Sequence, residues 1–200
     1  MSGELVTVFG GSGFIGRTLV QRLAKAGYRV RVAVRRPNSA LDVKTLGDLG
    51  QVHLAQANVR NKPSIEAAIN GADHVVNLVG VLFESGKQSF GKIHDEGAGL
   101  VAEVAAAANV KSLVHMSAIG ADDESDSKYA KSKAAGEKAV LKNFPNASII
   151  RPSVVFGADD NFFNKFAAMA KSFRMLPVIC GDTKFQTVYV GDVADAIVSI

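Results

Sequence analysis

The segment LVTVFGGSGFIGRTLVQRLAKAG, residues 5–27, decides the fold of this 200-residue chain. Its first five residues are apolar or β-forming and predict a buried strand. Gly10, Gly11, Gly13 and Gly16 follow, and apolar side chains then recur at helical spacing. A strand, a glycine turn and a helix in this order predict a dinucleotide site, because N–H groups at the helix N-terminus can bind a pyrophosphate. The alternative is a tight strand–helix turn that holds no ligand.

The composition is typical of a globular protein, because 48% hydrophobic and 21% charged residues suffice for a buried core in one substantial domain. No apolar run approaches the roughly 20 residues of a membrane-spanning helix, so we expect no direct membrane span. The net charge of +4 is spread along the chain without a basic stripe, so we expect no nucleic-acid partner. The start of the chain lacks signal or transit-peptide features, which predicts a cytoplasmic location.

A metal centre is not expected from this sequence. Cys180 is the only cysteine, which excludes a disulfide within the chain and is typical of a reducing compartment. His94, Asp95 and Glu96 lie at the start of an expected helix, but the sequence shows no further metal ligand that another element would bring to them. Acidic residues near a helix N-terminus are ordinary partners of the helix dipole. We therefore predict no metal site.

The rest of the chain alternates strands and helices, which predicts an α/β protein with a parallel sheet. Further strands are expected at residues 29–34, 51–57, 74–79, 110–117, 148–150 and 185–190, and helices at 63–70, 92–108, 127–142 and 159–171. The aromatic stripe of the last of these helices, which includes Phe162 and Phe166, is typical of a core-facing side. A final helix opens at GDVADAI, where the sequence stops. Either this helix is short and terminal or, as we expect, the chain is a C-terminally truncated part of a longer protein.

Two arginines follow the second strand, where a dinucleotide fold meets the adenosine ribose. An acid there would accept hydrogen bonds from the 2′-hydroxyl, but this chain has Arg35 and Arg36 and no acid until Asp42. Guanidinium groups match a phosphate in charge and in bidentate geometry. The sequence therefore favours NADP(H) over NAD(H). The alternative is two exposed arginines at the start of a loop.

Two further positions are expected to contact the nucleotide. Asn58 follows the third strand and could meet the adenine amino group, and an Asx turn is an equally good interpretation. Gly80 ends the almost continuous apolar run of the fourth strand. A glycine at this point lets the chain pass close to a ribose.

Tyr129 and Lys133 lie four residues apart on an expected helix and therefore on one face. A lysine ammonium beside a tyrosine favours the phenolate and lowers the phenol pKa from about 10. The tyrosine could then exchange a proton with an alcohol or a carbonyl during hydride transfer. This pair is the predicted catalytic pair.

Several motifs together resemble the extended short-chain dehydrogenase/reductase superfamily. They occur in the family's order: GGSGFIG (10–16), NLVG (77–80), YAKSK (129–133), RPSVVFG (151–157) and VYVGDVADAI (188–197). A closer similarity is to the atypical branch that contains the nucleotide-binding accessory subunit of respiratory complex I and its bacterial relatives. That similarity rests on LGDLGQ, NLVG, KSKAAGEKAV and RPSVVFGADDNF. It implies complex I subunits as partners and, for a mitochondrial precursor, the matrix side of the inner membrane.

The resemblance implies a doubly wound Rossmann fold with strand order 3-2-1-4-5-6-7 over residues 1–200. Residues 151–200 would be the start of the substrate-side segment, and most of the C-terminal substrate portion would be absent. It selects the register Gly10, Gly13, Gly16 for the pyrophosphate turn. The cofactor-binding residues it implies are Gly10, Gly13, Phe14, Ile15, Gly16, Arg35, Arg36, Asn58, Val59, Leu78, Val79, Gly80, Lys133, Pro152 and Ser153. Tyr129 and Lys133 match the family's catalytic pair.

The chain also departs from the family's pattern. Asn58 replaces the usual acid, and MSAIG replaces a run of Ser or Thr, so Ser117 is the remaining candidate for a third catalytic residue. Two hypotheses remain open. One is a subunit that binds NADP(H) without turnover, and the other is an active NADP(H)-dependent oxidoreductase or epimerase.

Overall fold

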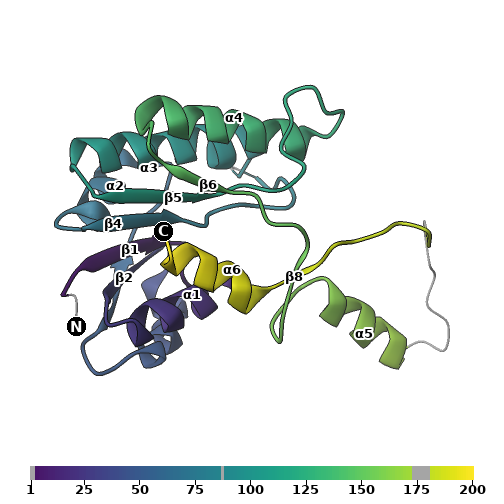
Figure 1. Ribbon diagram of the computed structural model, residues 1–200, viewed down its shortest axis with the longest axis horizontal. Coiled ribbons are helices and arrows are strands. Elements are labelled where there is room, and N and C mark those ends of the chain that lie inside the picture. The colour runs from purple at the N-terminus through teal and green to yellow at the C-terminus, as the bar shows by residue number, and fades with distance from the viewer. Residues whose placement is uncertain (1–2, 87, 173–180) are drawn as a thin grey trace.

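The computed structural model describes residues 3–86, 88–172 and 181–200. A parallel sheet of six strands lies between two layers of helices (Figure 1). Its strands are β1 (Leu5–Phe9), β2 (Arg29–Val34), β3 (Val52–Gln56), β4 (His74–Asn77), β5 (Ser112–Met116) and β6 (Ser148–Ile150). The order is β3-β2-β1-β4-β5-β6, and all neighbouring pairs are parallel. The predicted doubly wound α/β fold is confirmed.

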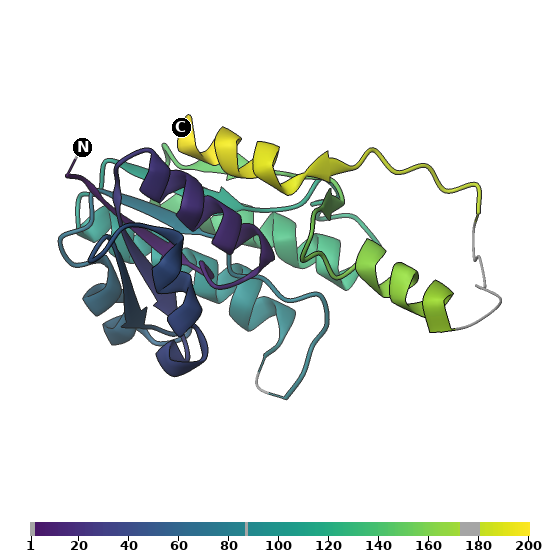
Figure 2. The same cartoon turned by 90° about the horizontal axis from the view of Figure 1, so that it is seen from below.

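Helices cover both faces of the sheet, because parallel strands need crossover connections. The helices are α1 (Phe14–Lys25), α2 (Lys62–Ile69), α3 (Glu96–Ala107), α4 (Lys128–Asn143), α5 (Phe163–Ser172) and α6 (Val190–Val198). Two short 3₁₀ helices, Pro37–Ser39 and Leu41–Leu46, follow β2. On one face α1 and α6 pack side by side (Figure 2). On the other, α3 packs between α2 and α4.

The strands have a buried apolar core on each side. All five residues of β1 are buried, as expected for a strand covered on both faces. Val6 and Val8 belong to the core under α1 and α6, whereas Phe9 belongs to the core under α2, α3 and α4. The buried hydroxyl of Thr7 donates to the Ala68 carbonyl at 3.0 Å and so ties β1 to α2.

The expected seventh strand is not part of this sheet. Val188–Tyr189 (β8) instead pairs in parallel with Val155–Phe156 (β7) in a separate two-stranded sheet. The chain between them carries α5 away from the main body (Figure 1). The physical reason is local, since β8 finds its hydrogen-bonding partner in the segment after β6 and not at the edge of the main sheet.

The aromatic side of α5 is also not in the core, contrary to the expectation from its spacing. No residue of α5 is buried, and Phe162, Phe163, Phe166 and Met169 are each 37–40% exposed. The Phe162 ring instead contacts the rings of Phe163 and Phe166, with centroids 5.0 and 5.3 Å apart. Cys180 lies outside the described residues.

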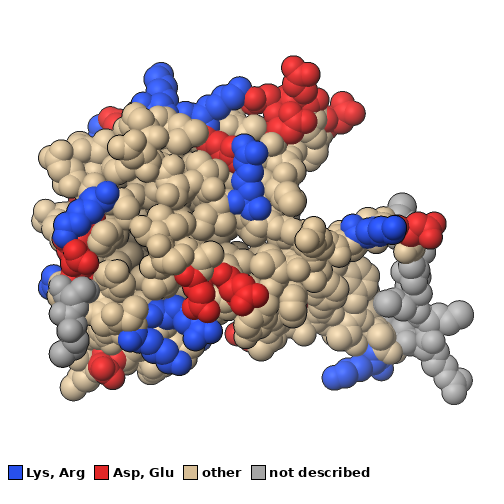
Figure 3. Space-filling view, in the orientation of Figure 1, with Lys and Arg blue, Asp and Glu red and all other residues tan. Residues whose placement is uncertain are grey.

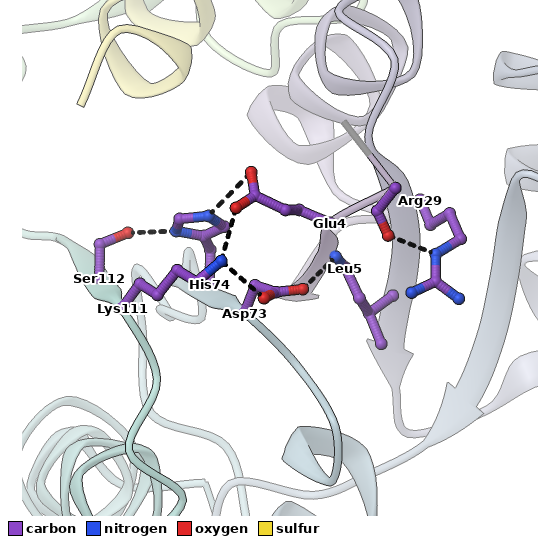
Figure 4. A network of polar contacts seen from close by, with 8 residues as sticks. Glu4, Leu5, Arg29, Asp73, His74, Lys111 and Ser112 are labelled. Atoms are coloured by element: carbon purple, nitrogen blue, oxygen red, sulfur yellow. Dashed lines mark hydrogen bonds and ion pairs between the residues drawn. The ribbon is translucent and has the colours of Figure 1, made fainter. Parts of the chain in front are cut away.

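The amino ends of three strands are tied by a polar network (Figure 4). Asp73 accepts a hydrogen bond from the Leu5 amide at 2.8 Å, and the Lys111 ammonium contacts Asp73 at 3.0 Å and Glu4 at 2.6 Å. His74 on β4 lies 2.8 Å from the hydroxyl of Ser112 on β5. These contacts fix the sheet at the edge opposite the glycine turn and leave the carboxyl edge free for a site.

Charged side chains are distributed unevenly over the face of the molecule that Figure 3 shows. Figure 3 shows acidic side chains gathered at the loop between β5 and α4, which carries Asp122, Asp123 and Glu124, while Lys and Arg are scattered. Within residues 3–86, 88–172 and 181–200, no helix combines the length and apolar character that crossing a membrane requires.

Candidate functional site

A cavity of about 290 Å³ opens at the carboxyl ends of the central strands. Eight of the predicted cofactor-binding residues line it: Gly10, Gly13, Arg35, Asn58, Val59, Leu78, Val79 and Gly80. A second cavity of about 290 Å³ shares Arg35, Ala57 and Asn58 with the first and is otherwise lined by the polar residues Gln56, Asn61 and Ser64. In open α/β sheets ligands bind at this edge, where the strand order reverses between β1 and β4.

The glycine turn has the backbone that the sequence predicts. Gly10 has a φ of +79°, a conformation that side chains rarely allow, and its carbonyl accepts a hydrogen bond from the Gly13 amide at 3.0 Å. A Cβ on Gly16 would lie 2.3 Å from the Gly10 oxygen, so only glycine lets α1 approach the turn this closely. Gly13 is the N-cap of α1 and makes no side-chain cap, which leaves the first N–H groups of the helix available to an anion.

Three predicted residues position the turn without lining the cavity. Gly16 packs on Gly10 and Gly11, and Ile15 packs against the core under α1. Phe14 begins α1, and its ring lies 3.2 Å from the position of a Cβ built on Gly157. These residues therefore contribute to the site by fixing the start of α1.

The two arginines are not equivalent. Arg35 lines both cavities, and its Nη1 donates to Gln88 Oε1 at 2.6 Å. Arg36 is exposed and lines neither cavity. Among the described residues that line the two cavities, Arg35 is the one charged side chain, so no carboxylate there opposes a bound phosphate.

Asn58 forms the Asx turn that was one of its two interpretations. Its Oδ1 accepts a hydrogen bond from the Arg60 amide at 3.1 Å, and its own amide donates to Ser64 Oγ at 3.0 Å. The turn still leaves Asn58 on the surface of both cavities. Val59 beside it is 5% exposed and belongs to the core under α2 and α3.

A buried asparagine, Asn77, shapes the next side of the cavity. Asn77 ends β4, and its Oδ1 accepts from the Val79 amide at 3.1 Å. This turn ends the strand two residues earlier than expected and brings Leu78, Val79 and Gly80 to the cavity surface. An asparagine that directly follows an apolar run and precedes a glycine is a turn signal that could have identified it.

Other cavity residues were also missed: Phe9, Ser12, Ala33, Val34, Ala57, Val81, Gln88 and Ile93. Several are apolar side chains of strands, which the hydrophobic pattern assigns only to the core. Gln88 lies in a loop whose path no local pattern predicts.

Helix α4 brings the tyrosine and the lysine to the same edge. Lys133 is 4% exposed, and its ammonium donates to the Met116 carbonyl at the end of β5 at 2.7 Å. The same ammonium lies 3.9 Å from the position of a Cβ built on Gly80, so Lys133 lies beside the cavity. The Tyr129 ring contacts Phe90 edge-on, with centroids 5.9 Å apart.

The surroundings of Tyr129 oppose the predicted lowering of its pKa. Burial raises the pKa of Tyr129 above its usual value of 10.0. The Lys133 ammonium is engaged with the Met116 carbonyl, and burial lowers the pKa of Lys133 to about 8. The tyrosine is therefore a neutral phenol at physiological pH in this arrangement.

The third catalytic candidate directly follows Met116, whose carbonyl Lys133 contacts, but its hydroxyl has no hydrogen-bond partner within the described residues. Ser117 is 4% exposed, and its Oγ makes no hydrogen bond within the described residues. Pro152 and Ser153 are half-buried and line neither cavity, and the Pro152 carbonyl accepts from the Ile119 amide at 3.0 Å. Across the part of the chain that the structure describes, no three His, Cys, Asp or Glu side chains group as metal ligands would.

Two buried histidines near Lys133 predict acid sensitivity. Burial, with the positive charge of Lys133, lowers the pKa of His94 to about 4 and that of His115 to about 3. Below pH 6.5 the unfolded chain binds protons that the folded protein does not, so stability falls as the pH decreases. We expect a loss of about 2 kcal/mol per histidine between pH 7 and pH 5. Urea unfolding at the two pH values measures this, with a smaller loss in His94→Gln. An equal loss in that variant would contradict the assignment.

Comparisons with known proteins agree with this geometry. The family model described as the NAD dependent epimerase/dehydratase family matches residues 6–200. The chain is 41% identical over 202 residues to "NADH dehydrogenase [ubiquinone] 1 alpha subcomplex subunit 9, mitochondrial" of Arabidopsis thaliana, covering 100% of this chain and 50% of that protein. It is 30% identical over 195 residues to "Ceramide reductase" of Caulobacter vibrioides, covering 98% of this chain and 60% of that protein. The chain thus spans about half the length of the mitochondrial relative.

A solved structure has the same fold at low sequence identity. The Bordetella bronchiseptica enzyme WbmG in complex with NAD matches with a TM-score of 0.77 and 19% identity, covering 99% of this chain and 68% of that one. This likeness supports the fold, whereas the family match and the relatives support the sequence resemblance.

Proposed function

Because the chain belongs to the NAD dependent epimerase/dehydratase family, we propose that its turn at residues 10–16 binds the pyrophosphate of NADP(H). The observation that carries the proposal is the cavity at the carboxyl edge, with eight of the predicted residues on its surface and Arg35 as its charged group. The proposed role is that of the complex I accessory-subunit type, in which the nucleotide is held without turnover.

The residues present fit this cofactor. A Cβ on Gly10 would lie 3.3 Å from the Leu78 backbone and one on Gly16 would lie 2.3 Å from the Gly10 oxygen, so the turn needs glycine at both positions. The N-terminus of α1, at Gly13 on the cavity surface, has no side-chain cap. Asn58 and Val59 would contact the adenine, and Leu78, Val79 and Gly80 the ribose side. When bound, the cofactor supplies the hydride chemistry of a nicotinamide.

A preference for the 2′-phosphate rests on Arg35. Its Nη1 is already directed to a neutral acceptor, Gln88 Oε1, at 2.6 Å, and phosphate oxygens are stronger acceptors for a guanidinium. Arg36, on the exposed start of the same loop, is a secondary partner. Both arginines therefore favour NADP(H) over NAD(H).

Replacing Arg35 by glutamate tests this preference. We expect Arg35→Glu to weaken NADPH binding by about 100-fold, because a charge-assisted pair becomes a repulsive one, and to change NADH binding by less than about threefold. The matched control is Arg29→Glu, which changes the net charge equally at the other end of β2. Calorimetric titration of each variant with both nucleotides measures the effect. Equal losses for the two nucleotides would show that Arg35 does not contact the 2′-phosphate.

Binding without turnover is supported by the geometry of the tyrosine–lysine pair, because the Lys133 ammonium donates to the Met116 carbonyl at 2.7 Å and is engaged there. The relative named as a complex I subunit supports partners of the same kind. The proposed location is the matrix or cytoplasmic side of an energy-transducing inner membrane, where other subunits would hold the protein.

An active oxidoreductase or epimerase is the second candidate, and Ser117 favours it. A buried hydroxyl without a partner normally costs free energy, and a substrate oxygen could supply the missing hydrogen bond. In that reaction Tyr129 would give or take a proton at the substrate oxygen, while Lys133 and Ser117 would position the reacting groups.

The two candidates differ in turnover. The experiment is to incubate the full-length protein with NADPH and a panel of aldehydes and ketones, and to follow NADPH oxidation alongside copurification with complex I. We expect bound NADPH, copurification and no oxidation. Oxidation that Tyr129→Phe abolishes would establish the enzyme instead.

A further inference from the structure

His94 is a buried polar side chain to which no role has been given. It is 1% exposed and lies in a π-helical turn, Gly91–Asp95, immediately before α3. Such turns are rare and are frequent at functional sites. The ring stacks on Phe90 with centroids 5.4 Å apart and meets the Tyr129 ring edge-on at 5.5 Å. His94 therefore fills the space between the turn before α3 and the tyrosine of α4.

A chain of hydrogen bonds fixes the tautomer of this ring. The Val81 amide donates to His94 Nε2 at 2.9 Å, and an amide can only donate, so Nε2 carries no proton. Nδ1 lies 2.9 Å from Ser132 Oγ, and that hydroxyl donates its own proton to the Tyr129 carbonyl at 2.7 Å. Nδ1 must therefore carry the ring proton and donate it to Ser132. Each donor in this series of hydrogen bonds has an acceptor only when the ring proton is on Nδ1.

The surroundings keep the ring neutral. A second proton, on Nε2, would face the Val81 N–H donor directly. The Lys133 ammonium is also close, because a Cβ built on Gly80 would lie 3.5 Å from His94 Nε2 and 3.9 Å from Lys133 Nζ. Burial and this charge lower the pKa of His94 to about 4, so the neutral ring persists at physiological pH.

The two ends of the chain of hydrogen bonds belong to different parts of the candidate site. Val81 lines the cavity next to Gly80, whereas Ser132 and Tyr129 belong to the helix that carries Lys133. We propose that His94, as the neutral Nδ1–H tautomer, is a positioning residue that sets the tyrosine–lysine pair against the nucleotide cavity. The inference rests on the proposed function, since it is NADP(H) binding that this positioning would serve.

Two variants of His94 separate its hydrogen bonds from its bulk. His94→Gln keeps an acceptor for Val81 and a donor for Ser132, whereas His94→Phe keeps a stacked ring and loses both bonds. We expect His94→Phe to bind NADPH about 10-fold more weakly, and His94→Gln to stay within about twofold of the wild type. Affinities are measured by titration at a temperature where circular dichroism shows each variant folded. Ser132→Ala, expected to weaken binding in the same direction, replaces His94→Phe if that variant does not fold.

The wild-type tautomer is measured independently of any nucleotide, by two-bond ¹H–¹⁵N correlation spectra of the histidine rings. We expect the Nδ1–H pattern for His94 between pH 5 and pH 8. An Nε2–H pattern overturns the inference, and so does an NADPH affinity in His94→Phe and Ser132→Ala equal to that of the wild type, whatever their melting temperatures. A wild-type protein that binds no NADPH overturns the proposed function, and the inference fails with it. Failure of the inference alone leaves wild-type binding intact.

Discussion

Gly136→Ala is expected to destabilise the protein by about 3 kcal/mol or more. A Cβ at this position in α4 would lie 2.0 Å from the carbonyl oxygen of His94 and 3.0 Å from its carbonyl carbon. Both are backbone atoms of the π-helical turn, so no side-chain rotation can relieve the overlap. The helix that carries Tyr129 and Lys133 would have to move away from the turn. For a chain of this length we expect the melting temperature to fall by roughly 6–12 °C.

Gly99→Ala is the matched control for this prediction. Gly99 lies in α3 on the same interface, and a Cβ there would meet the Ala139 side chain at 3.2 Å. That contact is tight but involves one methyl group, and alanine favours a helix by about 1 kcal/mol over glycine. Differential scanning calorimetry of both variants should show a large loss for Gly136→Ala and a small one for Gly99→Ala. Similar melting temperatures would mean that α4 can shift freely, which contradicts the packing described above.

Gly16→Ala is expected to abolish measurable NADPH binding and to destabilise the protein by about 3 kcal/mol. The added Cβ would lie 2.3 Å from the Gly10 oxygen and 2.6 Å from the Gly11 Cα. Gly10 lines the cavity and holds a positive φ, so displacing it deforms the surface that would accept the pyrophosphate. Titration with NADPH and urea unfolding measure the two effects.

Gly91→Ala serves as the control, because it also lies in the first turn of a helical segment and a Cβ there meets nothing within 4 Å. We expect this variant to bind NADPH like the wild type and to unfold at the same or a higher urea concentration, because alanine favours a helix over glycine. If Gly16→Ala also kept its NADPH affinity, the turn would not be the pyrophosphate site.

The sequence predicts the elements best where local pattern and tertiary burial agree. β2 has the expected bounds because basic and apolar residues alternate along RVRVAV, and the segment RRPNS directly after them breaks this pattern. β4 is shorter than its apolar run because the Asn77 side chain turns the chain, and the helix after it begins with a π turn around His94. Hydrophobic periodicity carries no information about such side-chain hydrogen bonds.

Predictions that depend on distant partners were less accurate. The spacing of Tyr129 and Lys133 places them on one face of a helix, but the direction of the ammonium depends on the Met116 carbonyl at the end of another strand. The stripe on α5 predicts an amphipathic helix, and its spacing cannot tell what covers it. In contrast, the backbone of the glycine turn was predicted correctly. Gly10 is needed for a positive φ and Gly16 for the close approach of α1 to the turn, and both needs arise within a few residues of the sequence.

We expect NADP(H) to bind at the glycine turn. The most direct measurement is a titration of the ¹⁵N-labelled protein with NADPH, followed by amide ¹H–¹⁵N spectra. We predict that the largest shifts occur at Gly10, Gly13, Arg35 and Gly80, which line the cavity, and that Lys111 at the opposite edge of the sheet stays unchanged. Saturating NADPH that shifts none of the cavity amides, or shifts a different surface, would contradict the account.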